Sequence, residues 1–512
     1  MQGMALAQSE KVSDGLSPIL AIDRKEAKPL HKQIYDGYRA AIAVRSLRAG
    51  QQIPSTRDLS RELKISRIPV LTAYAQLLAE GYFETRVGAG TFVCSSLPDQ
   101  TPPRGDGNGH GRGTAARAKS GAEVGAGARR ISKRSQLMPK HEIEPWLRGV
   151  GAFGLSQPAY DHFPTQIWSS LVTRHSRGKG AHSLHYGGPM GYEPLREAIC
   201  VYLRTARAVK CDPSQVMIVS GSQQALEISS RVVLDPGDAA WIEEPGYWLT
   251  RSVLKGAGAK MVPVPVDKEG LNVAAGVRMK RKARAAFVTP SHQYPLGVTM
   301  SASRRMHLLD WAQRAGSWVI EDDYDSEYRF ENMPIASLQG LDSHSRVIYI
   351  GTFSKTLFPS LRLGYLVVPA DLVERFVAVR HALDLTPPYL QQAVLNDFMR
   401  EGHYARHIRK MRALYHERRT ALVESLEKEF GGEMEIWGAQ AGMHLVAELP
   451  EKREWDDAEI AREAAKRKLW LWPLSPAYIG EKKRQGFILG FGNVGASEIP
   501  AAVKVMKSVV RS

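Results

Sequence analysis

The chain has 512 residues, 43% of them hydrophobic, and this length predicts two or more domains with cores of their own. Its formal net charge of +16 favours a polyanionic partner, and it shows neither a signal-peptide pattern nor an apolar run of membrane-spanning length. Its three cysteines have no metal-ligand spacing and are too few for a disulfide framework. We therefore expect a soluble cytoplasmic protein with no membrane contact and no metal site.

Residues 19–96 predict a small helical unit that ends in a hairpin. Apolar residues recur at helical spacing over residues 30–42, Ser55 is expected to cap a second helix, and Ser66 is expected to cap a third. Two short strands follow, joined by a turn that contains Gly88. Two helices with a tight turn and a glycine-tipped hairpin describe a winged helix-turn-helix, whose second helix enters the DNA major groove.

Two segments of this unit, IPSTRDLSRELKISR and AYAQLLAEGYFETRVGAGTFV, resemble the GntR family of bacterial regulators. The resemblance covers nearly all of residues 29–94 and implies that the unit binds double-stranded DNA. It also implies DNA contacts at the starts of two helices and a wing shaped by glycine. The residues concerned are Ser55, Arg57, Ser66, Arg67, Gly88 and Gly90.

The start of the third helix departs from the family pattern. Ile68 and Pro69 stand where the family usually has small polar residues. Proline is tolerated in the first turn of a helix, so we still expect the helix to form. Two base or phosphate contacts are in doubt, which leaves open the DNA sequence that is read. The alternative for Arg57 and Arg67 is that they are solvated helix arginines.

Two segments have few apolar residues and no periodicity. Residues 1–18 are predicted to form a disordered tail. Residues 97–140 are predicted to form a flexible basic linker, because between Leu97 and Ser135 there are eight glycines and eight Lys or Arg residues against three acidic ones. The linker charge would add non-specific attraction to phosphate. The alternative is a plain tether with solubilising arginines.

Residues 141–512 alternate strand-like runs with helical patterns. Such alternation predicts a three-layer α/β domain with a mostly parallel sheet. The whole chain is therefore predicted to be multidomain, with a mostly helical winged helix-turn-helix followed by an α/β domain. Ligands of α/β sheets bind outside the carboxyl ends of the strands, so the residues that follow each strand are candidates for a site.

Lys355 lies on a turn between two apolar runs that predict neighbouring strands. A lysine with apolar flanks is poorly solvated, which lowers its pKa, and a neutral amine can attack a carbonyl. Thr352, Ser354 and Arg362 lie close to it in sequence and can bind a phosphate group. The alternative is an ordinary solvated lysine.

Four other strand ends also carry residues suited to a cofactor. Ser222 and Gln223 follow one strand at the expected start of a helix, where backbone N–H groups bind anions. Tyr247 follows another strand and can stack on an aromatic ring. His292 lies in the polar segment after a third, and Asp322 follows a fourth, where an acid can keep a pyridinium nitrogen protonated. Each residue alone has a plain packing explanation, but together they indicate one cofactor site.

In chain order, these segments resemble the cofactor site of fold-type I aminotransferases, and HYGGPMGYEPLREAI is similar to that family's glycine-rich substrate segment. The resemblance implies pyridoxal 5'-phosphate as the cofactor, with Lys355 as its Schiff-base lysine. It implies that Asp322 pairs with the ring nitrogen and Tyr324 with the phenolic oxygen. The other implied cofactor contacts are Ser222, Gln223, Thr352, Ser354 and Arg362 near the phosphate, Tyr247 on the ring, and His292 as a polar clamp.

A GntR-like unit joined by a linker to an aminotransferase-like body resembles the MocR subfamily of bacterial transcription regulators. TPSHQYPLG, IEDDYDSEYRF and GTFSKTLFPSLRLGYLVVP are similar to that subfamily in particular. The resemblance implies a head-to-tail homodimer, located in the cytoplasm and on the nucleoid when bound to its operator, which senses an amine or amino acid. Two alternatives are an active aminotransferase that carries a DNA-binding domain and a regulator whose large domain only dimerises.

Two departures bear on the effector. Tyr294 stands where aminotransferases have an asparagine, and His292 or Gln293 are possible substitutes. Residues 486–492 lack the arginine that commonly grips a substrate carboxylate, although Arg484 is close in sequence. The open explanations are an effector without an α-carboxylate, a clamp supplied from elsewhere, or pyridoxal phosphate itself as the signal. The candidates for another clamp are Arg196 and His185.

Overall fold

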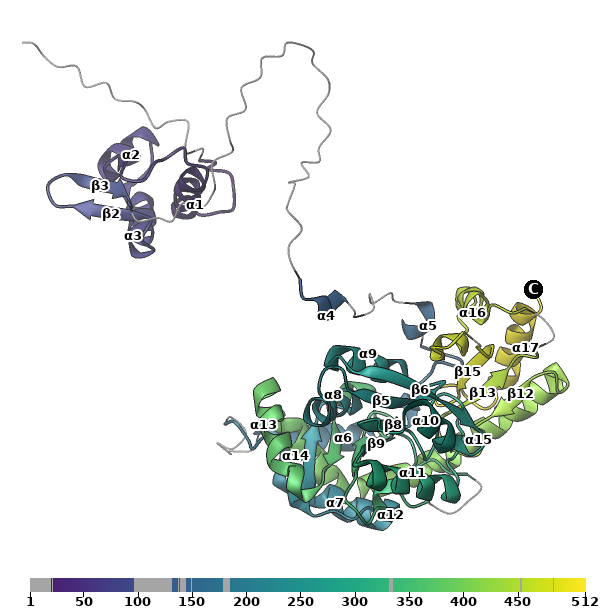
Figure 1. Cartoon of the computed structure of the whole chain (residues 1–512). Helices are drawn as coiled ribbons and strands as arrows, with labels where there is room; N and C mark the ends of the chain where they lie inside the picture. The colour runs from purple at the N-terminus through teal and green to yellow at the C-terminus, as the bar shows by residue number, and fades with distance from the viewer. Residues whose placement is uncertain are drawn as a thin grey trace, which may run out of the picture. The chain divides into compact units, whose positions relative to one another are not determined.

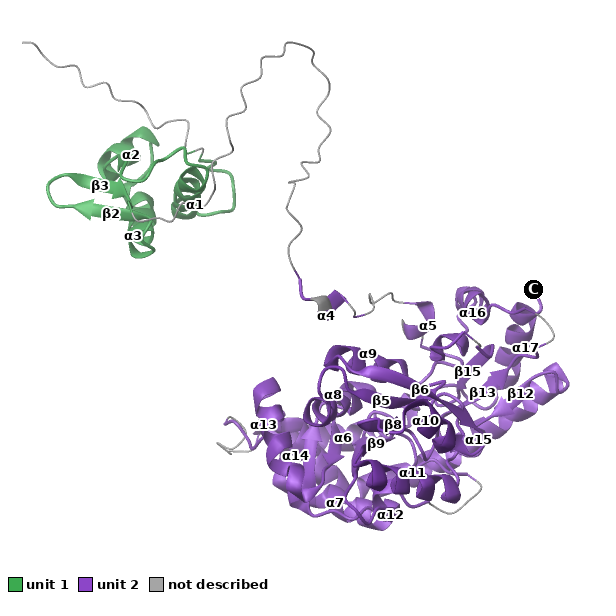
Figure 2. Ribbon diagram, viewed as in Figure 1, with its two compact units in different colours: residues 1–124 green, residues 125–512 purple. Residues whose placement is uncertain are grey.

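The computed structural model divides the chain into two compact units, residues 1–124 and residues 125–512 (Figure 2). The predicted tail, residues 1–18, lies outside the described residues, as does most of the predicted linker, residues 97–140. Within that linker, a short helix, α4, covers Lys133–Gln136. The structure describes residues 20, 22–95, 131–136, 138, 144–148, 150–177, 185–330, 335–451, 454–481 and 483–512.

The smaller unit has the predicted winged helix-turn-helix architecture (Figure 1). Its strands form an antiparallel sheet in the order β1-β3-β2, and its core includes the edge-to-face rings of Tyr38, Tyr74 and Phe83. Strand β1 was not predicted, because two residues are too few to show a period. The elements are α1 (Leu30–Ala43), β1 (Gln52–Ile53), α2 (Thr56–Glu62), α3 (Arg67–Ala79), β2 (Phe83–Arg86) and β3 (Gly90–Val93).

The two predicted helix caps differ in the structure. Ser55 precedes α2, and its hydroxyl accepts a hydrogen bond from the Asp58 backbone N–H at 3.2 Å. Ser66 occupies the corresponding position before α3, but its side chain makes no capping hydrogen bond. Instead, Arg67 Nε donates to Thr56 Oγ1 at 3.1 Å, so the starts of the two helices are joined.

The larger unit is built on an eight-stranded sheet in the order β4-β11-β10-β9-β8-β5-β6-β7. Four neighbouring pairs from β10 to β6 are parallel, which confirms the mostly parallel sheet. Strand β11 is antiparallel to both neighbours, since only a short connection follows β10 and a parallel return needs a longer crossover. The strands are β4 (Val216–Val219), β5 (Ala239–Glu244), β6 (Lys260–Asp267), β7 (Gly270–Leu271), β8 (Ala285–Val288), β9 (Trp318–Asp323), β10 (Val347–Thr352) and β11 (Gly364–Val367).

Helices cover both faces of this sheet, as a three-layer α/β domain requires. Helices α8 and α13 pack on one face, and α7, α14 and α15, with α10 and α11 further along the sheet, pack on the other. The bounds are α7 (Glu193–Arg207), α8 (Ser222–Val233), α10 (Val273–Lys280), α11 (Ala302–Ala315), α13 (Val373–Asp384), α14 (Tyr389–Arg400) and α15 (His403–Phe430). Further helices are α6 (Thr165–Arg177), α9 (Trp248–Ala257) and α12 (Leu338–Leu341).

A second, four-stranded antiparallel sheet in the order β12-β13-β15-β14 completes the larger unit. Its strands come from the last part of the chain, and α5 contacts the adjoining helix α16. The elements are α5 (Pro145–Arg148), β12 (Glu435–Trp437), β13 (His444–Glu448), α16 (Asp457–Lys466), β14 (Trp472–Pro473), β15 (Gly486–Gly490) and α17 (Ile499–Val510). Within the described ranges, no helix combines the length and apolarity that crossing a bilayer requires.

Candidate cofactor site

A cavity of about 340 Å³ lies at the carboxyl ends of the strands in the larger sheet. Nine of the ten residues predicted to contact a cofactor line it, although they come from four separate strand ends. The sequence prediction therefore converges on one place in the fold. These nine are Ser222, Gln223, Tyr247, Asp322, Tyr324, Thr352, Ser354, Lys355 and Arg362.

Lys355 lies on the turn that follows β10, with its amine enclosed by the cavity wall. Burial lowers its pKa to about 8, while the nearby carboxylates of Asp325 and Asp322 act in the opposite direction. At pH 7.5 roughly a quarter of a lysine with this pKa is neutral, against about one part in a thousand for a lysine of ordinary pKa. The amine is thus both accessible from the cavity and activated for attack on a carbonyl.

The three successive acids at the end of β9 are separated by the pleat of the strand. Asp322 lines the cavity, whereas Glu321 and Asp323 point to the opposite face. Oδ1 of Asp322 is buried and has no hydrogen-bond partner among the described residues. Burial and the neighbouring Asp323 raise the Asp322 pKa to about 7. A protonated pyridine nitrogen in the cavity would give this carboxylate the partner that it lacks.

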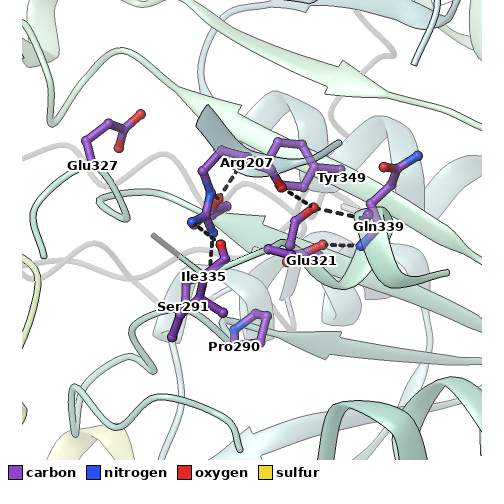
Figure 3. A network of polar contacts seen from close by, with 12 residues as sticks. Arg207, Pro290, Ser291, Glu321, Glu327, Ile335, Gln339 and Tyr349 are labelled. Carbon is purple, nitrogen blue, oxygen red and sulfur yellow. Dashed lines mark hydrogen bonds and ion pairs between the residues drawn. The ribbon is translucent and has the colours of Figure 1, made fainter. Parts of the chain in front are cut away.

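Both acids on the other face are held by hydrogen bonds: Glu321 accepts from the backbone N–H groups of Leu338 and Gln339, and Asp323 contacts Arg207, a buried residue at the end of α7; Figure 3 shows the region around Arg207 and Glu321. The Arg207 guanidinium donates to Asp323 Oδ2 at 2.8 Å, to Ser291 Oγ at 2.7 Å and to the Ile335 carbonyl at 2.6 Å. The Tyr349 hydroxyl donates to Asp323 Oδ2 at 2.6 Å. This network anchors the end of β9 and so fixes the position of Asp322.

The other end of the cavity has the chemistry of an anion site. Ser222 opens α8, where the first N–H groups of the helix are free to bind an anion. Arg362 has a left-handed backbone (φ 52°) and donates to the Ser220 carbonyl at 2.6 Å. Thr352 Oγ1 accepts from the Ser354 N–H at 3.2 Å, which brings two hydroxyls together. A helix start, a guanidinium and hydroxyls together suit a phosphate group.

His292 is the predicted residue that the structure places differently. It lies behind the cavity wall, where its Nδ1 is 3.1 Å from Asp325 and 3.2 Å from the Tyr324 hydroxyl. Its ring lies so close to Gly297 and Gly442 that a Cβ at either glycine would clash with it. His292 is therefore held in place by tertiary packing. It does not line the cavity itself, but it contacts Asp325 and Tyr324, which do.

Gln293 does not replace the missing asparagine either, because its amide donates to the carbonyls of Pro245 (2.9 Å) and Tyr294 (2.6 Å). Tyr294 itself lines the cavity, edge-on to Tyr247 with 5.3 Å between ring centroids. The position that holds an amide in aminotransferases is thus an aromatic wall in this chain.

His292, Asp325 and His444 form a buried cluster whose possible metal-ligating atoms lie within 4.8 Å of one another. Hydrogen bonds explain the arrangement. Asp325 accepts from His292 and from the Met443 N–H (3.2 Å), and His444 Nε2 donates to the Pro295 carbonyl at 3.1 Å. Burial and the nearby His292 lower the pKa of His444 to about 3, so it is neutral.

None of the three candidates for a carboxylate clamp lies on the described cavity wall. Arg484 forms a bidentate pair with Glu448 and covers the ring of Trp437 at 4.3 Å. Arg196 donates to the Pro213 carbonyl at 2.9 Å, and His185 is exposed. Among the described lining residues, the basic side chains are Lys355 and Arg362, and both have cofactor roles in the prediction.

The remaining lining residues were not predicted from sequence. They are mostly aromatic or aliphatic, and several come from α5 or the smaller sheet, far in sequence from the strand ends that guided the prediction, while Trp248 and Leu249 directly follow Tyr247. Four of them lie in segments that the sequence analysis singled out, Thr289 and Tyr294 after β8, Asp325 in the acidic run of Asp322, and Pro359 after Lys355. The residues are Leu147, Leu155, Ser156, Trp248, Leu249, Thr289, Tyr294, Asp325, Pro359, Met443, His444 and Trp472.

In the smaller unit, the residues predicted to contact DNA are all exposed and lie where the motif requires. Ser55 and Arg57 lie at the start of α2, and Ser66 and Arg67 lie at the start of α3. Gly88, at the tip of the β2–β3 hairpin, has φ 75°, a conformation that favours glycine.

Comparison with known proteins agrees with both units. Residues 30–93 match the bacterial regulatory proteins of the gntR family, and residues 152–486 match aminotransferase class I and II. The chain is 38% identical over 491 residues to the probable rhizopine catabolism regulatory protein MocR of Rhizobium meliloti, covering 96% of this chain and 95% of that protein. The chain belongs to the MocR subfamily of GntR-type regulators. It is a DNA-binding transcription regulator whose larger unit is an aminotransferase-like, pyridoxal 5'-phosphate-dependent domain.

Two further similarities show the breadth of this relationship. The pyridoxine biosynthesis regulator PdxR of Corynebacterium glutamicum is 27% identical over 477 residues, which is 93% of this chain and 94% of that protein. Among solved structures, the kynurenine aminotransferase of Pyrococcus horikoshii, in complex with PMP, is 27% identical with a TM-score of 0.69. This similarity covers 76% of the MocR-type chain and 98% of the enzyme.

Proposed function

We propose that this MocR-type regulator holds pyridoxal phosphate in the 340 Å³ cavity through Lys355 and senses a primary amine that lacks a carboxylate. The observation that carries the cofactor assignment is a buried lysine of lowered pKa that shares a cavity with an unpartnered buried carboxylate, Asp322. The anion site around Arg362 lies on the same cavity wall. Lysine, acid and anion site thus match the aldehyde, the ring nitrogen and the phosphate of one molecule.

The residues of the cavity have separable roles in this proposal. Lys355 provides the covalent attachment, Asp322 holds the ring nitrogen protonated, and Tyr324 donates to the phenolic oxygen. Ser222, Gln223, Thr352, Ser354 and Arg362 bind the phosphate, and Tyr247 packs on the ring. Bound pyridoxal phosphate would supply a carbon that can exchange the Lys355 amine for another primary amine, with release of the lysine amine, and a ring that withdraws electrons.

The charge of the cavity supports an amine without a carboxylate. Arg362 would be engaged by the phosphate and His444 is neutral, so the basic side chain of the described wall that is left is the Lys355 amine that an effector amine displaces, which lies near the carboxylates of Asp322 and Asp325. Burying an unpaired carboxylate there would cost several kcal/mol. Aromatic side chains such as Tyr294, Trp248 and Trp472 line the rest of the wall and suit a ring or an alkyl group.

The proposal includes a homodimer in the bacterial cytoplasm, head to tail, that reaches the nucleoid through its operator. A dimer would present two winged units to two half-sites, and helix-turn-helix regulators read DNA in this way. Effector binding would act by changing the relative stability of dimer geometries that bind the operator differently.

The test is visible absorption spectroscopy of the full-length protein with pyridoxal phosphate, followed by titration with amines. Wild type should develop the band of a lysine-bound cofactor, and Lys355→Ala should not. Phenethylamine should shift the band at lower concentration than phenylalanine, which differs from it only by the carboxylate. A band that Lys355→Ala retains would overturn the cofactor assignment. If phenylalanine shifts the band at the same or a lower concentration than phenethylamine, the proposed class of effector is wrong.

A second candidate function is an active aminotransferase with a DNA-binding unit. It is favoured by the presence of both the lysine and the acid, and by 30% identity over 57% of this chain to aromatic-amino-acid aminotransferase 1 of Thermococcus litoralis. It requires a carboxylate site for amino acids, and the described wall does not provide one. Multiple turnovers of an amino acid with a keto acid would establish this function, whereas a regulator should stop after at most one half-reaction.

A further inference from the structure

The outward face of the recognition helix α3 is apolar. Ile68 is 73% exposed and Leu71 is 44% exposed, although both belong to a helix whose other face is already buried in the core of the unit. Large aliphatic side chains at such exposure gain nothing from folding. Their position on the helix expected to enter the major groove calls for a physical reason.

The exposed face presents methyl groups along its length. Ile68, Leu71, Thr72 and Ala75 follow the spacing i, i+3, i+4 and i+7, which places them on one side of the helix. The Thr72 hydroxyl donates to the Ile68 carbonyl at 3.1 Å, so its hydrogen bond is made within the helix. The donor of Thr72 is therefore used within the helix, its oxygen can still accept, and the rest of the face offers apolar contacts to a partner.

The surroundings of this face match the charge of DNA. Exposed basic side chains lie on α2, on the turn after it and at the start of α3. An acid in the same region, Asp58, is occupied by the Ser55 hydroxyl at 2.6 Å and faces Arg61 at 3.4 Å. An apolar strip bordered by cations fits a groove whose edges are phosphates and whose floor carries methyl groups. The basic residues are Arg57, Arg61, Lys64 and Arg67.

In the major groove, thymine presents its 5-methyl group, and apolar side chains read it by contact. We infer that Ile68 and Leu71 read thymine methyl groups, so that the operator half-site of this regulator carries thymines at the positions facing the first two turns of α3. The inference rests on DNA binding by the smaller unit and adds the class of base that is read. It also gives a function to the position where the family pattern of small polar residues is broken.

The experiment removes the methyl group and leaves every base-pair hydrogen bond in place. Full-length protein first selects a binding duplex from a randomised pool at fixed salt. The selected duplex is then resynthesised with deoxyuridine in place of each thymine in turn, and the dissociation constant is measured by fluorescence anisotropy. One or two positions in each half-site should lose about three- to fivefold in affinity, the value expected for one buried methyl.

Variants assign the effect to the side chains. Ile68→Ala should weaken binding to the thymine duplex and respond less than wild type to deoxyuridine at its own position, because the methyl would have lost its partner. Val44→Ala is the matched control, since Val44 is 75% exposed in the same unit but lies just after α1. It should bind both duplexes as wild type does. Circular dichroism melts should show unchanged folding for both variants.

Each outcome bears on a distinct claim. If no sequence is enriched from the pool, DNA recognition by the smaller unit fails, and this inference fails with it. If a sequence is enriched but deoxyuridine is tolerated at every position, DNA recognition stands and methyl reading is refuted. An equal response of wild type and Ile68→Ala to deoxyuridine at every position would refute the assignment to Ile68. If the apolar face instead binds a second copy of the protein, wild type and Ile68→Ala should respond equally to deoxyuridine, and wild type should self-associate whereas Ile68→Ala should not.

Discussion

Replacing Asp322 by asparagine should stabilise the cofactor-free protein at neutral pH. Burial and Asp323 raise the Asp322 pKa from 3.8 to about 7. At pH values above both of these pKa values, the shift lowers the free energy of unfolding by about 4 kcal/mol. A buried asparagine amide without full hydrogen bonding costs about 1–3 kcal/mol in return. The expected net gain for Asp322→Asn is therefore about 1–3 kcal/mol at pH 7.5.

The sign of the pH dependence follows from the direction of the shift. Because the folded pKa lies above the unfolded pKa, the folded state holds its proton more tightly, and stability is lost as the pH rises from about 4 to about 7. Asp322→Asn removes this loss. Its advantage over wild type should be largest at pH 7.5 and should vanish at pH 4.5.

The assay is urea denaturation of the apoprotein at pH 4.5, 6 and 7.5, monitored by tryptophan fluorescence. This signal reports on the larger unit, because all ten tryptophans lie there. Asp325→Asn is the matched control. The native Asp325 carboxylate accepts hydrogen bonds from His292 and from the Met443 N–H, so its replacement should destabilise the protein at neutral pH. A destabilised Asp322→Asn at pH 7.5, or an equal gain at pH 4.5, would refute the reasoning. With pyridoxal phosphate, the variant should bind the cofactor more weakly than wild type.

Two further predictions concern arginines. Arg207→Met should lower the free energy of unfolding of the larger unit by about 3–5 kcal/mol in the same assay, because Asp323 would stay buried without its cation. Arg231→Met, which removes an exposed pair with Glu227, should lower it by no more than about 0.5 kcal/mol. Equal losses in the two variants would contradict the role given to burial. Arg362→Gln should weaken pyridoxal phosphate binding about tenfold or more in a spectral titration, whereas Arg484→Gln, whose side chain is held by Glu448 away from the cavity, should change it less than twofold. A large effect of Arg484→Gln on the response to phenylalanine would show that it serves as the carboxylate clamp.

The parts of this site that could be predicted are those encoded next to strand ends. Asp322 lies at the end of a buried strand, and Ser222 and Lys355 each lie three residues after one, so the layered fold brings all three to one edge of the sheet. The strand alternation that separates Asp322 from its neighbours is also a local rule. Local sequence therefore determined both the location of the cavity and its main charges.

The parts that could not be predicted depend on contacts distant in sequence. His444 reaches the site from the smaller sheet, 152 sequence positions after His292. His292 was expected in the site but lies behind the cavity wall, where it contacts Asp325 and packs against two glycines. The sequence around His292 does not predict these contacts. The pairing of Arg484 with Glu448 likewise joins positions far apart in sequence, the end of β13 and the segment just before β15.

The cavity wall also includes the segment that follows the predicted linker. Leu147, on α5, lines the cavity, and the carbonyl of the adjacent Trp146 accepts a hydrogen bond from Trp472 of the smaller sheet at 3.1 Å. Asp325 accepts from the Met443 N–H just before β13, so the acids near Lys355 are tied to the same sheet. The cavity is thus connected both to α5, through Leu147, and to the smaller sheet, through Asp325 and Met443. Because α5 begins only five residues after the predicted linker, Leu147 is the described lining residue nearest in sequence to the DNA-binding unit.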